Sequence, residues 1–158
     1  GSFIGAVIDR LARGGDAARY RFPRAWLSRD SADFSFSGLK TALRTFLASP
    51  EGGSARAEDV AASFQEAIVD VLAGKAVAVA QRDGIPRLVL SGGVSANSRL
   101  RELARERGAA TGLEVFLPSG ALCTDNAAMV ALLGERRMSA GSTSGPEVNA
   151  YAASRFTR

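Results

Sequence analysis

Apolar residues recur at helical spacing in five stretches of the chain, and this periodicity predicts five helices. The predicted helices cover residues 3–11, 37–47, 57–82, 96–107 and 125–137. The third is expected to be the longest, because its apolar pattern is interrupted only by Gly74. Gly14 and Gly15 are expected to end the first helix, and Ser37 is expected to cap the second.

Two short apolar runs, at residues 87–90 and 113–117, each precede a predicted helix. Such runs are typical of buried strands, and the repeated order of strand, turn and helix predicts two βα units. The two strands should therefore pair in parallel. Residues 16–35 indicate an ordered connector held by aromatic side chains, residues 51–54 a flexible loop, and residues 139–158 a low-complexity tail.

The composition is that of a globular domain and excludes several kinds of site. The chain has 158 residues, 46% hydrophobic and 23% charged, which fits one compact domain or one lobe of a larger one. Its net charge of +4 is too small to argue for nucleic-acid binding without clustering on one face. With no His and one Cys, Cys123, it can form neither a Ser/His/Asp triad nor a zinc finger by itself.

No apolar run approaches the roughly 20 residues that span a bilayer, so we expect no membrane association. The N-terminus lacks the order of charged and apolar residues found in a signal peptide. A cytoplasmic location is therefore expected.

The segment LVLSGGVSAN, residues 88–97, carries the clearest chemical signal. Gly92 and Gly93 lack Cβ atoms, so their backbone can approach a planar or phosphorylated ligand, and a helix start nearby favours an anion. Ser95 is expected to mark that helix start, and Asn97, two residues on, could direct its amide at a base, a ribose or an acyl group. The same residues also suit a plain βα turn with a capped helix.

Three further positions allow two interpretations each. Asp125, expected as the first helical residue after a Thr124 cap, could bind a metal or simply complement the helix dipole. Asp9, one helical turn after Gly5, could reach a ligand lying over that glycine or pair with nearby arginines on the surface. Lys40 and neighbouring hydroxyls could hold a phosphate or be a solvated helix start.

Cys123 lies beside a predicted helix start. Because the chain has no His to act as a base, a buried apolar role is expected for this residue.

Three segments in one order resemble a known family. They are FSFSGLKTAL (34–43), LVLSGGVSANSRLRE (88–102) and CTDNAAMVA (123–131), with the long predicted helix between the first two. Together they are similar to the C-terminal half of the tRNA adenosine threonylcarbamoyltransferase family, TsaD and its archaeal and eukaryotic relatives. IDRLARGGD (8–16) and FPRA (22–25) extend the resemblance over nearly the whole chain.

The resemblance implies an α/β fold that is one lobe of an actin-like, ribonuclease H-like ATPase, with helices packed on a small, mainly parallel sheet. Residues 1–138 would form this nucleotide-binding lobe. Family members transfer a threonylcarbamoyl group from threonylcarbamoyl-adenylate to the adenosine next to the anticodon, in tRNAs that read codons beginning with A. They use an iron or zinc ion held by two His and one Asp.

Matched positions carry the family's site residues to this chain. Gly92, Gly93 and Asn97 would contact the adenine nucleotide or adenylate. Gly5 and Asp9 fall where the family binds the sugar region, and Asp125 would be the metal-binding Asp. No catalytic residue is assigned.

This chain departs from the family pattern, and the missing parts indicate which partners it needs. Family proteins are about twice as long, and their N-terminal half supplies the His pair and phosphate-binding loops, which are absent here. We expect this chain to be inactive alone and to require the N-terminal lobe, tRNA and other subunits of the transfer complex. Exposed apolar surface should also favour self-association. The alternative is a non-catalytic nucleotide- or protein-binding module derived from the family, which suits a chain without metal-binding His.

Overall fold

The structure is a computed structural model that describes residues 2–24, 26 and 31–147. Its elements, in chain order, are α1 (Ser2–Ala12), α2 (Ser37–Leu47), α3 (Pro50–Gly53), α4 (Ala57–Arg82), β1 (Arg87–Val89), the 3₁₀ turn η1 (Gly93–Ala96), α5 (Ser98–Thr111), β2 (Glu114–Phe116), the 3₁₀ turn η2 (Gly120–Leu122) and α6 (Ala127–Ser139). All five predicted helices and both predicted strands are present. The chain forms two compact units, Gly1–Thr124 and Asp125–Arg158, which are described separately.

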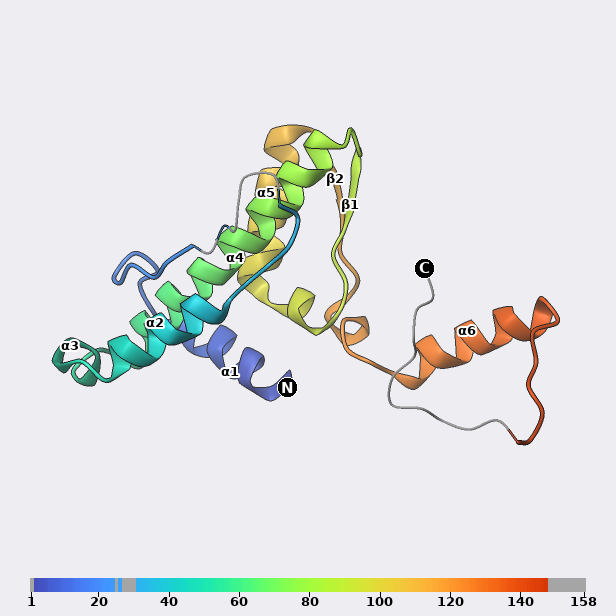
Figure 1. Cartoon of the computed structure of the whole chain (residues 1–158), viewed down its shortest axis with the longest axis horizontal. Helices are drawn as coiled ribbons and strands as arrows, with labels where there is room; N and C mark the ends of the chain where they lie inside the picture. Colours follow the sequence, from blue (N-terminus) through green and yellow to red (C-terminus); the bar gives the residue numbers. More distant parts are fainter. Residues whose placement is uncertain (1, 25, 27–30, 148–158) are drawn as a thin grey trace. The chain divides into compact units, whose positions relative to one another are not determined.

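Helix α4 is the central element of the first unit (Figure 1). It is 26 residues long and rich in alanine, and Glu58 and Asp59 in its first turn complement the positive end of the helix dipole. Both α1 and α5 pack against it. Fourteen of its residues are buried, so it is covered on more than one face, as expected of a helix at the centre of a fold.

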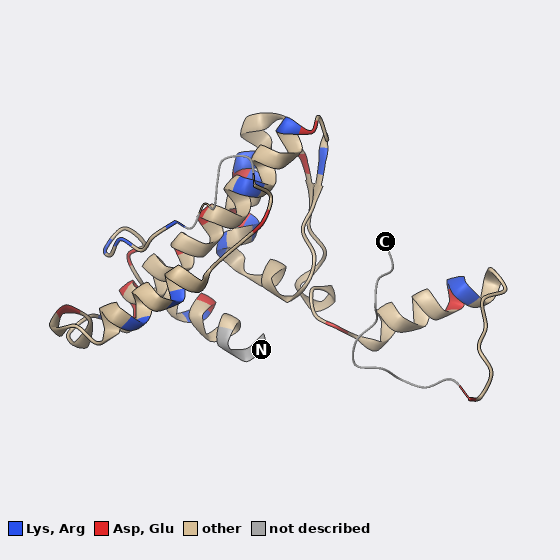
Figure 2. Cartoon of the chain, viewed as in Figure 1, with Lys and Arg blue, Asp and Glu red and all other residues tan. Residues whose placement is uncertain are grey.

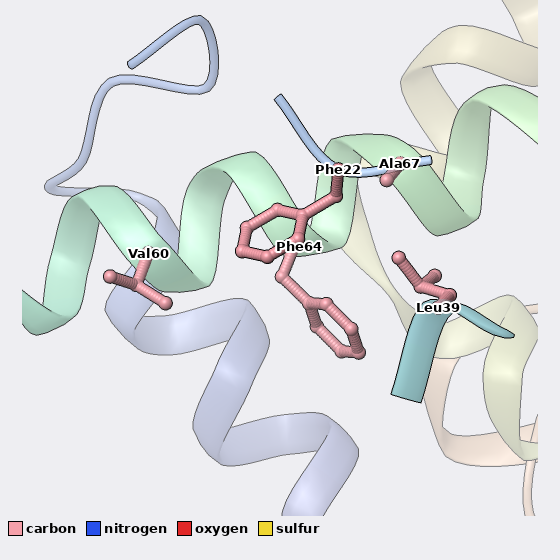
Figure 3. Packing of buried hydrophobic residues seen from close by; sticks show 5 residues of the cluster. All are labelled: Phe22, Leu39, Val60, Phe64 and Ala67. Atoms are coloured by element: carbon pink, nitrogen blue, oxygen red, sulfur yellow. The ribbon is translucent and has the colours of Figure 1, made fainter. Parts of the chain in front are cut away.

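The N-terminal half of α4 packs in an aromatic core with the connector and α2. Figure 3 shows this core, formed by Phe22, Leu39, Val60, Phe64 and Ala67. The rings of Phe22 and Phe64 meet edge to face, 5.8 Å between centroids, a favoured aromatic geometry. The prediction that aromatic residues hold the connector in place is confirmed for this part of it.

The C-terminal half of α4 packs against α5 and β1. The strands pair in parallel as predicted, with Leu88 opposite Val115. Leu88 packs on buried residues of α4, whereas Val89, on the other face of the sheet, is 68% exposed. A Cβ on Gly108 would lie 2.3 Å from Val115 Cγ2, so only glycine permits this close approach of α5 to β2. The fold is therefore α/β, with helices and a small parallel two-stranded sheet.

Two local predictions about α2 and α3 are wrong. Ser37 is the first residue of α2, not its cap, and the preceding Phe36 makes no side-chain capping bond. The flexible loop predicted at 51–54 is largely a helical turn, α3, whose cap Ser49 accepts a hydrogen bond from the Gly52 backbone N–H. The pair Ser49-Pro50, a capping residue followed by proline at the first helical position, is a standard helix start that the glycines obscured.

Part of the connector lies outside the aromatic core. Phe34 is 45% exposed and Trp26 is 42% exposed, so these two aromatic side chains do not join the core that holds the rest of the connector. Their rings instead face the ammonium group of Lys75, which is buried in α4 and donates a hydrogen bond to the Asp33 carbonyl oxygen. A buried ammonium group requires such partners, and the two rings supply cation–π contacts.

The second unit contains α6, which begins two residues later than predicted. Its N-cap is Asn126, whose side chain accepts a hydrogen bond from the Met129 N–H. Asp125 therefore precedes the cap and Thr124 is not the cap. Residues 148–158 lie outside the described part of the chain, and the predicted boundary after residue 138 stays a prediction. Among the described helices, none has the length and apolar character to span a bilayer.

Candidate functional site

The turn after β1 is held in a conformation that only glycine readily adopts. Gly92 has φ 86° and ψ 169°, a region of backbone space that is essentially restricted to glycine. Its carbonyl oxygen accepts hydrogen bonds from both the N–H and the Oγ of Ser95, at 2.9 and 2.7 Å. Ser95 is 2% exposed and closes the 3₁₀ turn, so the prediction that it starts the following helix is wrong.

The outer surface of this turn is open. Gly92 and Gly93 are exposed, and a Cβ added to either would meet no atom within 4 Å. The described residues therefore do not fill the space over the two glycines, and among them the backbone there is accessible to a ligand.

Asn97 is the N-cap of α5, not a residue two positions inside the helix as predicted. Its Oδ1 accepts a hydrogen bond from the Leu100 N–H at 2.9 Å, the usual N-cap bond. Its Nδ2 donates to Gln65 Oε1 on α4 at 2.7 Å. Both ends of the amide are fixed by the protein, and each retains one hydrogen-bonding position, because an amide offers two donors and two acceptor lone pairs.

Asp9 is buried and not an exposed surface acid, although the predicted pairing with a nearby arginine is present. Its Oδ1 accepts hydrogen bonds from the Ser98 N–H at 3.2 Å and the Ser98 Oγ at 2.7 Å, and its Oδ2 pairs with Arg13 at 3.2 Å. The carboxylate thus lies at the start of α5, where the helix dipole favours a negative charge. Gly5, one turn earlier on α1, is exposed, and no atom lies within 4 Å of a Cβ placed there.

Arg101 connects the loops that follow the two strands. Its guanidinium donates to the Ser95 carbonyl oxygen at 3.0 Å and to the Pro118 carbonyl oxygen at 2.8 Å, and it lies 3.7 Å from Cys123 Sγ. Cys123 is 3% exposed, so the prediction of a small buried side chain is confirmed. One side chain therefore bridges the Gly-Gly turn and the second loop, in addition to the pairing of the two strands.

Charges of both signs lie side by side along α4 and α5 (Figure 2). Arg99 pairs with Glu66 at 2.8 Å and with Glu102 at 2.7 Å, and its hydrogen bond to Glu66 is the largest cause of a raised Arg99 pKa. Arg99, Glu102 and Gln65 also line an open pocket of about 510 Å³ that adjoins Ser98.

Asp70 on α4 binds two arginines, Arg24 of the connector and Arg107 of α5. Desolvation by burial raises the pKa of Asp70, but the hydrogen bonds and charges of Arg107 and Arg24 together outweigh it and hold the pKa below its ordinary value. This carboxylate links three segments of the first unit.

The residues present do not fit a metal site. Asp125 is exposed and belongs to the second unit, and the chain has no His. Within the described ranges, no group of three or more Cys, Asp and Glu side chains could hold an ion. Asp125 supplies one carboxylate, and any further ligands would have to come from outside this chain.

The remaining candidates from the sequence, Lys40 and the hydroxyl groups near it, are not among the residues that bond to the Gly-Gly turn or to Asn97. Lys40 is exposed on α2, and the Ser35 and Ser37 hydroxyls bond to each other at 3.2 Å. Gln65 and Arg101 are the functional candidates that the sequence analysis missed. The one available signal was a polar Gln65 at a position of α4 where the helical pattern requires an apolar residue.

The fold and the candidate site define an α/β unit in which a strand passes through an exposed Gly-Gly turn into a capped helix. A family model described as tRNA N6-adenosine threonylcarbamoyltransferase matches residues 2–132. The chain belongs to this family.

Curated relatives of that name are similar over most of the chain. The protein of Syntrophotalea carbinolica is 46% identical over 148 residues, covering 92% of this chain and 43% of the relative. That of Anaeromyxobacter sp. (strain Fw109-5) is 51% identical over 150 residues, covering 92% and 44%, and that of Thermotoga neapolitana is 47% identical over 137 residues, covering 87% and 41%. The chain thus spans less than half the length of these relatives.

Proposed function

We propose that this chain is the nucleotide-binding lobe of a tRNA threonylcarbamoyltransferase with an actin-like fold. The complete enzyme would transfer a threonylcarbamoyl group from threonylcarbamoyl-adenylate to the adenosine next to the anticodon of tRNAs that read codons beginning with A. The observation that carries the proposal is the open Gly92-Gly93 turn followed by an Asn97 amide held at both ends. The resemblance to the family implies a nucleotide contact at these same residues.

The Gly92-Gly93 turn and the N-cap residue Asn97 would have separate roles in recognising the adenylate. The backbone of Gly92 and Gly93 would lie against the adenine, since neither residue has a side chain to keep the ring away. Asn97 would supply its remaining N–H and its remaining lone pair to the adenylate. Asp9 would act through the start of α5, because its Oδ1 already holds Ser98.

Other parts of the reaction would be supplied from outside this chain. An iron or zinc ion in the complete enzyme would take its other ligands from outside this chain, and Asp125 would add one carboxylate to them. The N-terminal lobe, tRNA and the other subunits of the transfer complex would be the partners, in the cytoplasm where tRNA is modified.

A chimera tests the activity directly. This chain would replace the 150 aligned residues of the Anaeromyxobacter relative, and transfer of the threonylcarbamoyl group to tRNA would be measured. We expect an active chimera in which Asn97→Ala lowers transfer at least about tenfold, equivalent to about 1.4 kcal/mol. Ser49→Ala is the matched control, since it removes the side-chain N-cap bond of α3, which belongs to none of the proposed sites, and should leave transfer unchanged.

The second candidate is a non-catalytic nucleotide- or protein-binding module, which the exposed Gly92-Gly93 turn would serve equally well. It predicts that the isolated chain binds an adenine nucleotide although the chimera transfers nothing. Active transfer by the chimera would rule it out.

A further inference from the structure

Gln65 is a polar side chain at the centre of the packed helix α4. It is 7% exposed and follows Phe64 of the aromatic core. Burial of an amide is unfavourable unless its polar atoms are bonded, and here Oε1 accepts the Asn97 Nδ2 hydrogen at 2.7 Å. Gln65 therefore faces Asn97, and its bond joins two residues 32 positions apart.

The two bonds to Asn97 determine which way its amide points. The Leu100 N–H requires an oxygen, and Gln65 Oε1 requires an N–H donor, so rotating the Asn97 amide by 180° would place like groups together on both sides. An N-cap bond alone would hold the oxygen, but it would leave the direction of the Nδ2 group less restricted. With Gln65 present, the remaining N–H has one direction.

The residue after Asn97 is held as well. The Ser98 N–H and Oγ both donate to Asp9, so the backbone at the start of α5 is held from α1 while the side chain of Asn97 is held from α4. A binding group that is already fixed loses less conformational entropy when a ligand arrives.

We propose that Gln65 is a positioning residue for nucleotide recognition: it orients the Asn97 amide so that the remaining N–H is directed at an adenine nucleotide. This inference rests on the proposed function, because it takes Asn97 as the ligand contact. Gln65 itself would not touch the ligand.

The test is a titration of the full 158-residue chain with AMP, followed by NMR of the Asn97 side-chain amide and the Gly92 backbone amide. The unmodified chain should bind at an order-of-magnitude Kd of about 1 mM. Gln65→Met keeps the length of the side chain without its acceptor, and it should weaken AMP binding about tenfold. Gln65→Glu restores an acceptor oxygen and should bind within about twofold of the unmodified chain.

A double variant separates positioning from a general effect on the fold. If Gln65 acts through Asn97, then Gln65→Met should change AMP affinity no further in an Asn97→Ala chain. A further tenfold loss in that background would overturn the inference.

If Gln65→Met does not fold, hydrogen exchange in the unmodified chain still tests whether Gln65 holds the Asn97 amide. One Asn97 Nδ2 hydrogen should exchange with water at least about tenfold more slowly than the side-chain hydrogens of Gln81, which is exposed on the same helix. Equal exchange rates would overturn the inference.

The failures of the two proposals are distinguishable. Equal AMP binding by the unmodified and Gln65→Met chains would overturn the role of Gln65 and leave the nucleotide site standing. If AMP shifts neither the Asn97 nor the Gly92 signal of the unmodified chain, the proposed nucleotide site is wrong, and the role of Gln65 is wrong with it.

Discussion

Gly92 has a backbone conformation that favours glycine, whereas the adjacent Gly93 does not. Gly92→Ala is expected to destabilise the chain by about 1–3 kcal/mol, because a side chain is strained at φ 86° and ψ 169°. Gly93→Ala is the matched control: its added Cβ also meets open space and its φ is not positive, so the change should stay within about 0.5 kcal/mol. Urea denaturation measures both free energies of unfolding. Equal values would show that the conformation of Gly92 is not a source of strain.

Asp9 and Asp125 are both candidate ligand residues, but their surroundings differ. Asp9→Asn is expected to cost about 1–3 kcal/mol, because the buried carboxylate accepts two hydrogen bonds from Ser98 and pairs with Arg13. Asp125→Asn should change stability by less than about 0.5 kcal/mol, because Asp125 is exposed and lies before the cap of α6. Thermal melting of the two variants checks this, and an unfolded Asp125→Asn chain would make that residue structural.

At the scale of elements, Asp70 makes the packing of α4 with α5 and the connector dependent on pH. Its pKa is lower in the folded chain than the unfolded value of about 3.9. The stability that it contributes is therefore fully present above about pH 4 and is lost as the pH falls through the lowered folded value.

Unfolding free energies between pH 6 and pH 2.5 would measure this contribution. The unmodified chain should be more stable than Asp70→Asn at pH 6, and the difference should shrink as the pH falls. A difference that does not change with pH would contradict the assignment, and the exposed Asp125→Asn variant is the control.

The sequence predicts the elements well, because helical and strand periodicity are local properties. It misplaces the start of α5 because a 3₁₀ turn, η1, separates the glycines from the helix, so that Asn97 and not Ser95 is at the boundary. Both residue types are good caps, and propensity alone does not choose between them. The bonds from Asn97 to Gln65 and from Ser98 to Asp9 span 32 and 89 positions, and no local pattern encodes such contacts.

At the scale of the whole molecule, exposed apolar side chains should make the isolated chain associate with itself. In α6 alone, Met129, Val130, Leu132, Leu133 and Met138 are each more than half exposed. Apolar patches of this kind on one element favour burial against another surface. Light scattering should show an average mass above the 16.5 kDa of one chain that rises with concentration.

A pair of lysine variants tests which residues cause the association. Leu133→Lys should lower it, because a charge on the apolar surface must be desolvated on contact. Ser139→Lys adds the same charge at an exposed end of α6 and should not. Equal effects would point to net charge, and a strictly monomeric unmodified chain would contradict the prediction.

The bond between Asp9 and Ser98 has a consequence for biosynthesis, because the ribosome makes its two partners at different times. The residues are 89 positions apart, so at roughly 5–20 residues per second the serine is made roughly 4–18 s after the aspartate. Helix α4 is made before α5. During that interval α1 can therefore pack against α4, but the carboxylate of Asp9 has no α5 to bond to. The residues of the aromatic core are therefore all made before the start of α5 can be fixed, and the Gly-Gly turn with its asparagine follows that core in the order of synthesis.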